Sequence, residues 1–149
     1  MTQETYTSDD YYTPKWIFDA LGVHFDLDVA CPPQGPLHTP CSAYFTQETD
    51  GLLSQWRGNV FMNPPYSKAT PWVKKFMAHK NGIALLPMAK SQWFNDIWND
   101  CEGITVLPCK LIFEHAENLK GSIFLPAMLA AYGTANLQAL NNLKIGKVR

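Results

Sequence analysis

The sequence has no apolar run that approaches the roughly 20 residues needed to cross a bilayer. Its start, residues 1–10, is polar and carries Glu4, Asp9 and Asp10, so it lacks the basic and apolar regions of a secretory signal peptide. It also has no internal repeat and no low-complexity segment. We therefore expect a cytoplasmic protein with no membrane partner. The length of 149 residues fits one compact domain over residues 1–149.

Cysteine is scarce, with four residues at positions 31, 41, 101 and 109. In a reducing compartment these are expected to be free thiols rather than disulfides. A metal site built from Cys31, His38 and Cys41 is the alternative. Their spacing matches no zinc pattern and a fourth ligand is not evident, so we expect no metal.

The formal net charge of −1 hides an uneven distribution along the chain. Residues 1–56 hold one base and eight acids, a net of −7, whereas residues 57–149 hold eleven bases and five acids, a net of +6. A basic half suits a phosphate backbone, and an acidic half suits a cationic ligand. Charges scattered over a solvated surface are the alternative interpretation.

Apolar spacing and turn residues predict short helices and strands that alternate along most of the chain. This alternation is typical of a three-layer α/β sheet that is partly parallel, with an antiparallel end. The expected elements are a helix capped by Thr13 and opened by Pro14 that stops at Gly22, strands over 23–30, 43–46 and 59–62, a helix capped by Thr70 that ends at 81–82, a strand over 83–86, a helix from Ser91 to about 100, a strand over 104–107, and strands over 111–114 and 122–132 around an Asn-Leu-Lys-Gly turn. The tail from Thr134 is expected to be a short helix or irregular.

Ligands of such sheets bind at the carboxyl ends of the strands. The segments that follow the expected strands are therefore candidates for a site: 28–31, 63–66 and 87–90. In the first strand, Phe25, Leu27 and Val29 are expected to share one face and Asp26 and Asp28 the other.

The most informative run is Asn63-Pro64-Pro65-Tyr66, directly after an apolar strand. Prolines fix the backbone and lack an N–H, so we expect the Pro64 carbonyl to face outward as an acceptor. The side-chain carbonyl of Asn63 is a second acceptor, and Tyr66 offers a flat face for stacking on a ring. Two converging acceptors hold a planar amino group through both of its hydrogens.

Such an arrangement suits methyl transfer to an exocyclic amino group. The amino nitrogen of adenine is a poor nucleophile because its lone pair is delocalised into the ring. Hydrogen bonds to both hydrogens pull the nitrogen toward tetrahedral geometry, so that it can attack a sulfonium methyl in line by positioning and electrostatics. A proline turn followed by a core tyrosine is the structural alternative.

Asn-Pro-Pro-Tyr after a strand is the signature of amino methyltransferases, and the chain resembles the phage-type Dam-like DNA N6-adenine methyltransferases. The matching stretches cover most of residues 11–113, and their order carries the resemblance, because only the run at 63–66 is specific alone. These stretches are Tyr12-Thr13-Pro14-Lys15-Trp16, Leu27-Asp28-Val29-Ala30, Tyr44-Phe45-Thr46 with Asp50-Gly51-Leu52, Gly58 to Ser67, and Leu85-Leu86-Pro87 with Trp93-Phe94.

The resemblance implies a three-layer, Rossmann-like class I methyltransferase sheet, partly parallel with an antiparallel C-terminal hairpin. It implies S-adenosylmethionine as the cofactor and transfer of a methyl group to N6 of adenine in DNA. The sheet is expected to be trimmed, because no glycine-rich loop follows Asp28 and the segment between the first two strands is too short for a crossover helix.

The resemblance also implies a role for each matching position. The implied catalytic residues are Asn63, Pro64, Pro65 and Tyr66. The implied cofactor residues are Thr13 and Pro14 at the methionine end, Asp28, Val29 and Ala30 in the first strand and its turn, Asp50 and Leu52 at the adenine ring, and Asn63.

Three of these positions have a simpler interpretation. Thr13-Pro14 is also a helix start. Asp28 is also a solvated strand residue, and Asp50 also fits a plain Asp-Gly turn.

An adenine within a duplex must leave the stack to reach such a site, so the expected partner is double-stranded DNA with a flipped adenine. Trp93 or Phe94 would cover the face of the base opposite Tyr66, although helical spacing also fits a core role for them. The candidate DNA-binding residues are Tyr66, Ser67, Lys68, Lys90 and Trp93, within a wider set of lysines that adds positions 74, 75 and 80. Loops 31–42 and 114–121 are the candidates for target recognition, in a monomer or a homodimer.

Two other classes of function stay open. An RNA-base or protein-glutamine methyltransferase needs the same two acceptors, and a degenerate DNA-binding module without catalysis would bind no cofactor.

Overall fold

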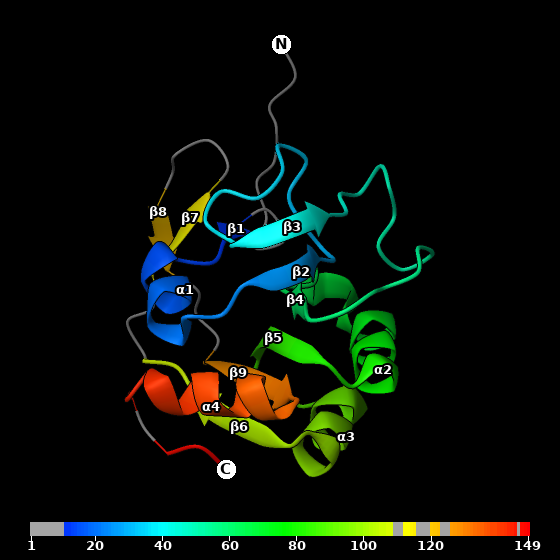
Figure 1. Cartoon of the computed structure of the whole chain (residues 1–149). Helices are drawn as coiled ribbons and strands as arrows, with labels where there is room; N and C mark the ends of the chain where they lie inside the picture. The colour runs from blue at the N-terminus through cyan, green and yellow to red at the C-terminus, as the bar shows by residue number, and fades with distance from the viewer. Residues whose placement is uncertain (1–10, 109–111, 116–119, 123–125, 146) are drawn as a thin grey trace.

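A mixed six-stranded sheet forms the centre of the computed structural model, which describes residues 11–108, 112–115, 120–122, 126–145 and 147–149 (Figure 1). The strand order is β3-β2-β4-β5-β9-β6, and β2 to β5 are mutually parallel. β9 is antiparallel to both of its neighbours, so the sheet ends in an antiparallel part, as expected. The strands are β2 (Phe25–Asp28), β3 (Cys41–Tyr44), β4 (Val60–Met62), β5 (Gly82–Pro87), β6 (Gly103–Val106) and β9 (Ala127–Tyr132).

Four helices cover the two faces of this sheet and give it three layers (Figure 1). The inner strands are buried throughout, and alternate residues pack on opposite faces. Phe61 and Ile83 pack with α1 and α4, whereas Met62 and Ala84 pack with α2 and α3. The helices are α1 (Lys15–Leu21), α2 (Ala69–His79), α3 (Gln92–Asp100) and α4 (Thr134–Asn142).

A second, three-stranded sheet contains the expected hairpin. Its order is β1-β7-β8, and both pairings are antiparallel. The single strand expected over 122–132 is wrong, because the chain leaves this small sheet after β8 and enters the main sheet as β9. Six consecutive buried residues suit β9 to the interior of a covered sheet. The strands are β1 (Tyr11–Tyr12), β7 (Ile112–His115) and β8 (Lys120–Ser122). Of the turn predicted at 118–121, the first two residues fall outside the described residues and the last two lie in β8.

Two of the expected helix starts are wrong, and one is confirmed. Thr13 does not cap α1, which begins at Lys15 after Pro14 and has no side-chain cap. Thr70 lies inside α2, because a 3-10 turn over Tyr66–Lys68 leads directly into that helix. Ser91 caps α3 as predicted, since its Oγ accepts a hydrogen bond from the Phe94 amide at 3.4 Å.

The predicted alternation in β2 fails at Phe25. Leu27 and Val29 pack on the α2–α3 face, but Phe25 packs against Phe61 on the other face, with ring centroids 5.4 Å apart. The backbone is irregular here, because the carbonyl of Asn59 accepts hydrogen bonds from the amides of both residue 26 and Leu27. Such an irregularity shifts the alternation of faces.

No helix in the described part of the chain is long and apolar enough to span a membrane. The tail from Thr134 begins as the helix α4, which was one of the two expectations for it. After α4 the last residues return along β6, where the amide and carbonyl of Arg149 bond with those of Ile104 at 2.8 and 2.7 Å.

A buried pair of amide side chains joins the start of α4 to the start of β4. Asn136 is 2% exposed and donates to Asn59 Oδ1 at 2.7 Å and to the Tyr132 carbonyl at 2.8 Å. Asn59 donates in return to Asn136 Oδ1 at 3.1 Å. Each amide therefore satisfies the other, and removing one leaves a buried polar group unpaired.

We predict that Asn136→Ala lowers the free energy of unfolding by roughly 1–3 kcal/mol, because the Asn59 amide loses its partner. Urea unfolding followed by tryptophan fluorescence measures this change. Asn141→Ala is the matched control on the exposed side of the same helix, and it should change stability by less than about 0.5 kcal/mol. Equal effects of the two substitutions would contradict a structural role for the amide pair.

Candidate active site

The segments that follow β2, β4 and β5 meet at one edge of the main sheet, as predicted, because these strands are parallel. We call this side of the sheet the carboxyl edge and the other side the amino edge. Asp28 pairs with Phe61, and the Val29 amide donates to the Phe61 carbonyl at 3.1 Å. Asn63, two residues after Phe61, therefore follows β4 at the edge where Ala30 follows β2.

Asn63 is oriented by Thr13, which is distant in sequence. The Asn63 Nδ2 donates a hydrogen bond to Thr13 Oγ1 at 3.3 Å. Thr13 is 5% exposed, and the helix that follows it is anchored in the core by Ile17 and Phe18. Because the amide nitrogen is turned toward Thr13, the amide oxygen of Asn63 points to the other side as an acceptor.

The Pro64 carbonyl is a second acceptor next to this amide. Among the described residues it accepts no hydrogen bond, whereas the Pro65 carbonyl accepts one from the Lys68 amide at 3.0 Å and closes the 3-10 turn. Both prolines lack an N–H and have a restricted backbone. The segment is therefore a rigid acceptor loop at the end of β4.

Tyr66 lies on the same loop and is fixed at its far end. Its hydroxyl donates to the Leu85 carbonyl of β5 at 3.5 Å, and the residue is partly buried. Loss of solvent raises the pKa of Tyr66 above that of a free phenol, so the hydroxyl is neutral at physiological pH. The ring thus offers an uncharged flat surface beside Asn63 and Pro64.

Asp28 is a buried acid at the end of β2, which excludes the solvated alternative. It is 4% exposed, and its Oδ1 accepts a hydrogen bond from the Ala30 amide at 3.2 Å. Burial raises the pKa of Asp28, whereas hydrogen bonds from Cys31, the Ala30 amide and Thr39 act in the opposite direction. The same burial raises the pKa of Cys31, so this thiol is an uncharged donor to the carboxyl group.

The turn that contains Asp50 packs directly against the end of β2. A Cβ on Gly51 would lie 2.0 Å from the Val29 carbonyl, so only glycine allows this approach. Asp50 has a φ of 50°, and its Oδ1 accepts from the amides of Leu52 and Leu53 at 3.1 and 3.3 Å. The carboxyl group therefore makes the Asp-Gly turn that the simpler interpretation expected, and it does so next to β2.

Lys75 of α2 holds this turn in place. Its ammonium group is directed to backbone carbonyls and not to solvent, so it does not suit the phosphate contact considered for it. Its ammonium donates to the carbonyls of Gly51 at 3.2 Å and Leu52 at 2.6 Å, and also to that of Ser54. It lies 5.1 Å from the centre of the Trp56 ring, within range of a cation–π interaction. Desolvation lowers the pKa of Lys75, and the Asp50 charge opposes this effect.

The other candidate DNA contacts differ in exposure. Ser67, Lys68 and Lys90 are exposed at the carboxyl edge. Trp93 is 8% exposed and packs in the core, which favours the packing role for this ring. Phe94 is partly buried and stacks on Trp98 with ring centroids 6.1 Å apart.

Three features of the site had no signal in the sequence. The contact of Thr13 with Asn63 joins residues 50 positions apart, and the Lys75 contacts join α2 to a turn more than 20 positions away. The hydroxyl of Thr39, from the loop before β3, reaches Asp28. Among the described residues, no group of three or more His, Cys, Asp or Glu side chains is placed to hold a metal ion.

Comparison with known proteins shows the family of the chain. The sequence model of the family described as "DNA N-6-adenine-methyltransferase (Dam)" matches residues 2–125. The chain is also 38% identical over 79 residues to the DNA N-6-adenine-methyltransferase of Escherichia phage T1, a match that covers 48% of this chain and 32% of that protein. The match thus spans about a third of the relative's length. Because the family match includes Thr13, the Asp50 turn and the whole loop at Asn63–Tyr66, the chain belongs to the DNA N-6-adenine-methyltransferase (Dam) family.

Proposed function

We propose that this chain transfers a methyl group from S-adenosylmethionine to the N6 amino group of adenine in double-stranded DNA. The observation that carries the proposal is the orientation of the Asn63 amide, whose nitrogen donates to Thr13 and whose oxygen is thereby left as an acceptor on the residue that precedes Pro64. Family membership and the name of the phage relative, a DNA N-6-adenine-methyltransferase, support the same chemistry.

The two acceptors would act on the amino group of the substrate. Asn63 Oδ1 and the Pro64 carbonyl would each accept a hydrogen bond from one N–H of this amino group. These two hydrogen bonds localise the lone pair on the nitrogen. The proline backbone cannot rotate away, so the acceptors are already in place before the base enters. When bound, the cofactor supplies an electrophilic methyl group on a sulfonium centre.

Tyr66 would hold the ring of the adenine. A base that leaves the duplex loses its stacking, and an aromatic side chain restores part of that energy. Because its hydroxyl is bonded to the Leu85 carbonyl, the Tyr66 ring loses little further freedom when a base stacks on it. The prolines and Tyr66 together position the amino group at the acceptors.

The residues at the β2 end of the carboxyl edge fit a cationic cofactor that carries hydroxyl groups. Asp28 and Asp50 place two carboxyl groups there, and the Asp50 turn is held against β2 through Gly51. Carboxylates favour a sulfonium charge and accept hydrogen bonds from ribose hydroxyls. The residues that would hold the cofactor are Thr13, Pro14, Asp28, Val29, Ala30, Asp50, Leu52 and Asn63.

We infer that the main sheet is a trimmed Rossmann-like class I methyltransferase sheet within a single domain. The reversed strand β9 between β5 and β6 supports this assignment. In place of the helices of a doubly wound fold, irregular segments connect β2 to β3 and β3 to β4. The second of these segments contains the Asp50 turn, so a compact loop replaces a helix at the cofactor end.

Recognition of the DNA target would involve the small sheet. β7 pairs with β1, whose last residue, Tyr12, directly precedes Thr13. The hairpin at 112–122 is therefore tied to the segment that contacts Asn63. This position supports loop 114–121 as a reader of sequence near the flipped adenine, with Ser67, Lys68 and Lys90 as contacts to the backbone.

We predict that Asn63→Ala lowers kcat for DNA methylation by at least about 100-fold, because one of the two acceptors is removed. Digestion of the treated DNA to nucleosides and mass spectrometry measure N6-methyladenine directly. Binding of S-adenosylhomocysteine by calorimetry and the melting temperature should both be retained. Asn95→Ala, on the exposed side of α3, is the control and should stay active.

Each alternative function has its own outcome in these assays. When S-adenosylmethionine with a labelled methyl group is offered with DNA, RNA and protein, label transferred only to RNA or to protein glutamine would reject DNA as the substrate. A wild-type chain that binds no S-adenosylhomocysteine would be a non-catalytic module. Unfolding of the Asn63→Ala variant would assign the residue a structural role.

We further predict that Thr13→Val lowers kcat by roughly tenfold, the effect of one net hydrogen bond that orients the Asn63 amide. Thr13→Ser keeps the hydroxyl and should restore kcat to near the wild-type value. KM for DNA should change little in either variant. A Val variant as active as the wild type, or a Ser variant as impaired as Val, would show that the hydroxyl does not position Asn63.

A further inference from the structure

The C-terminal tail, described at residues 143–145 and 147–149, starts at the carboxyl edge of the main sheet and runs back along β6. β9 runs opposite to β5, so α4 begins at the amino edge, where a Cβ on Gly103 would lie 2.2 Å from Leu137. The helix α4 then carries the chain across the sheet. From there the tail runs antiparallel to β6, with Arg149 opposite Ile104 and the Lys147 carbonyl accepting from Thr105 Oγ1 at 3.0 Å.

This course places two lysines of the tail at the carboxyl end of β6. Lys147 lies beside the last residues of β6, and Lys144 precedes it at the end of α4; both are exposed. Val148, between Lys147 and Arg149, packs against the core instead, so the tail is anchored by its apolar residue and its backbone. The Lys147 side chain is therefore presented from a fixed segment, and Lys144 from the residues that directly follow α4.

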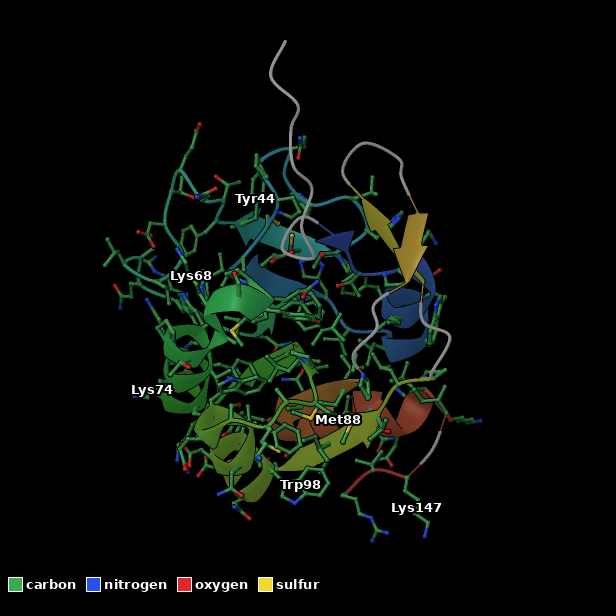
Figure 2. The ribbon with its side chains drawn as sticks, turned by 180° about the vertical axis from the view of Figure 1, so that it is seen from behind. Tyr44, Lys68, Lys74, Met88, Trp98 and Lys147 are labelled. Atoms are coloured by element: carbon green, nitrogen blue, oxygen red, sulfur yellow. The ribbon has the colours of Figure 1, made fainter. Side chains whose placement is uncertain are left out.

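Exposed lysines thus follow the carboxyl edge across β4, β5 and β6. Lys68 follows β4, Lys90 follows β5, and Lys144 with Lys147 lies beside β6. In Figure 2, Lys68, Met88 after β5 and Lys147 lie along one diagonal of the molecule. Within the described part of the chain none of these lysines forms an ion pair.

Two of the five acids of residues 57–149, Asp100 and Glu102, lie toward the amino edge, near the start of β6. Asp100, at the end of α3, accepts a hydrogen bond from the Tyr132 hydroxyl at 2.5 Å. Glu102, just before β6, accepts one from the Gly133 amide at 3.3 Å. Residues 126–149 contain no acid at all. The β4–β6 side of the carboxyl edge is therefore the part of the sheet suited to a polyanion.

We propose that Lys144 and Lys147 bind phosphates of the DNA backbone and extend the contact surface of Lys68 and Lys90 to the β6 end of the sheet. The proposal rests on the proposed function, and it concerns a segment beyond residues 2–125, the part matched by the family. Three strand spacings separate β4 from β6, about 14 Å. This distance corresponds to the rise of roughly four base pairs along the axis of a duplex.

The test compares two charge-matched double variants. Lys144→Gln/Lys147→Gln removes the proposed phosphate ligands, while the backbone hydrogen bonds of the tail are retained. Lys80→Gln/Arg149→Gln removes the same charge from the amino edge. Lys80 belongs to the wider set of candidate lysines, but the structure places it just before β5, and Arg149 lies opposite Ile104 near the start of β6. Fluorescence anisotropy with a labelled duplex, in the presence of S-adenosylhomocysteine, gives Kd between 50 and 200 mM KCl.

We expect the Lys144/Lys147 variant to reduce the slope of log K against log salt by about 1.8, which is about 0.9 for each phosphate that is no longer neutralised. Its Kd should rise at least about fivefold at 0.1 M salt, and kcat at saturating DNA should be unchanged. The control variant should keep a slope near that of the wild type. Equal slopes in the two variants would overturn the proposal, even if the wild type methylates DNA.

Failure of the proposed function gives a different result. A wild type that yields no N6-methyladenine and binds no duplex at any salt would overturn both proposals. Salt-dependent binding to RNA but not to the duplex would mean that the lysines bind RNA, and it would overturn the proposal that they bind DNA phosphates.

Discussion

One hydrogen bond, from the Asn63 amide nitrogen to the Thr13 hydroxyl, sets the side-chain orientation on which the proposed function depends. An amide side chain offers a donor on one side and an acceptor on the other, and only the acceptor is useful toward an amino group. A neighbour that occupies the donor selects the useful orientation. The two prolines after Asn63 have the same effect on the backbone: because proline has no N–H, this segment offers carbonyl acceptors and no backbone donors.

The order of the strands separates the two charged parts of the site. β2 and its turns bring the buried Asp28 and the Asp50 turn to one end of the carboxyl edge, and lysines follow β4 and β5 toward the other. The uneven distribution of charge along the sequence thus becomes a separation in space. A cationic cofactor and an anionic polymer are favoured at opposite ends, with the acceptor loop between them.

Local sequence patterns predicted most of the elements and the position of the site. The elements were predictable from the apolar runs and from end signals such as Gly22 and Ser91. The position of the site followed because parallel strands bring the polar segments after them to one edge. Long-range contacts were not predictable: Thr13 looks like a helix cap, but its hydroxyl meets Asn63. Lys75 looks like a surface lysine, but its ammonium meets three carbonyls. The sequence pattern predicted one strand over 122–132, whereas β8 ends at Ser122 and β9 lies in the main sheet between β5 and β6. The position of β9 depends on pairing with these distant strands, which no local pattern shows.

The tail on β6 also restricts how copies of the chain can associate. An uncovered edge strand invites another chain to continue the sheet. Residues 147–149 occupy this position at β6, so on that side of the described sheet the edge is a segment of three residues, and β3 is the edge strand on the other side. Two copies joined through β3 would form a closed pair with twofold symmetry, and growth into fibres would stop there.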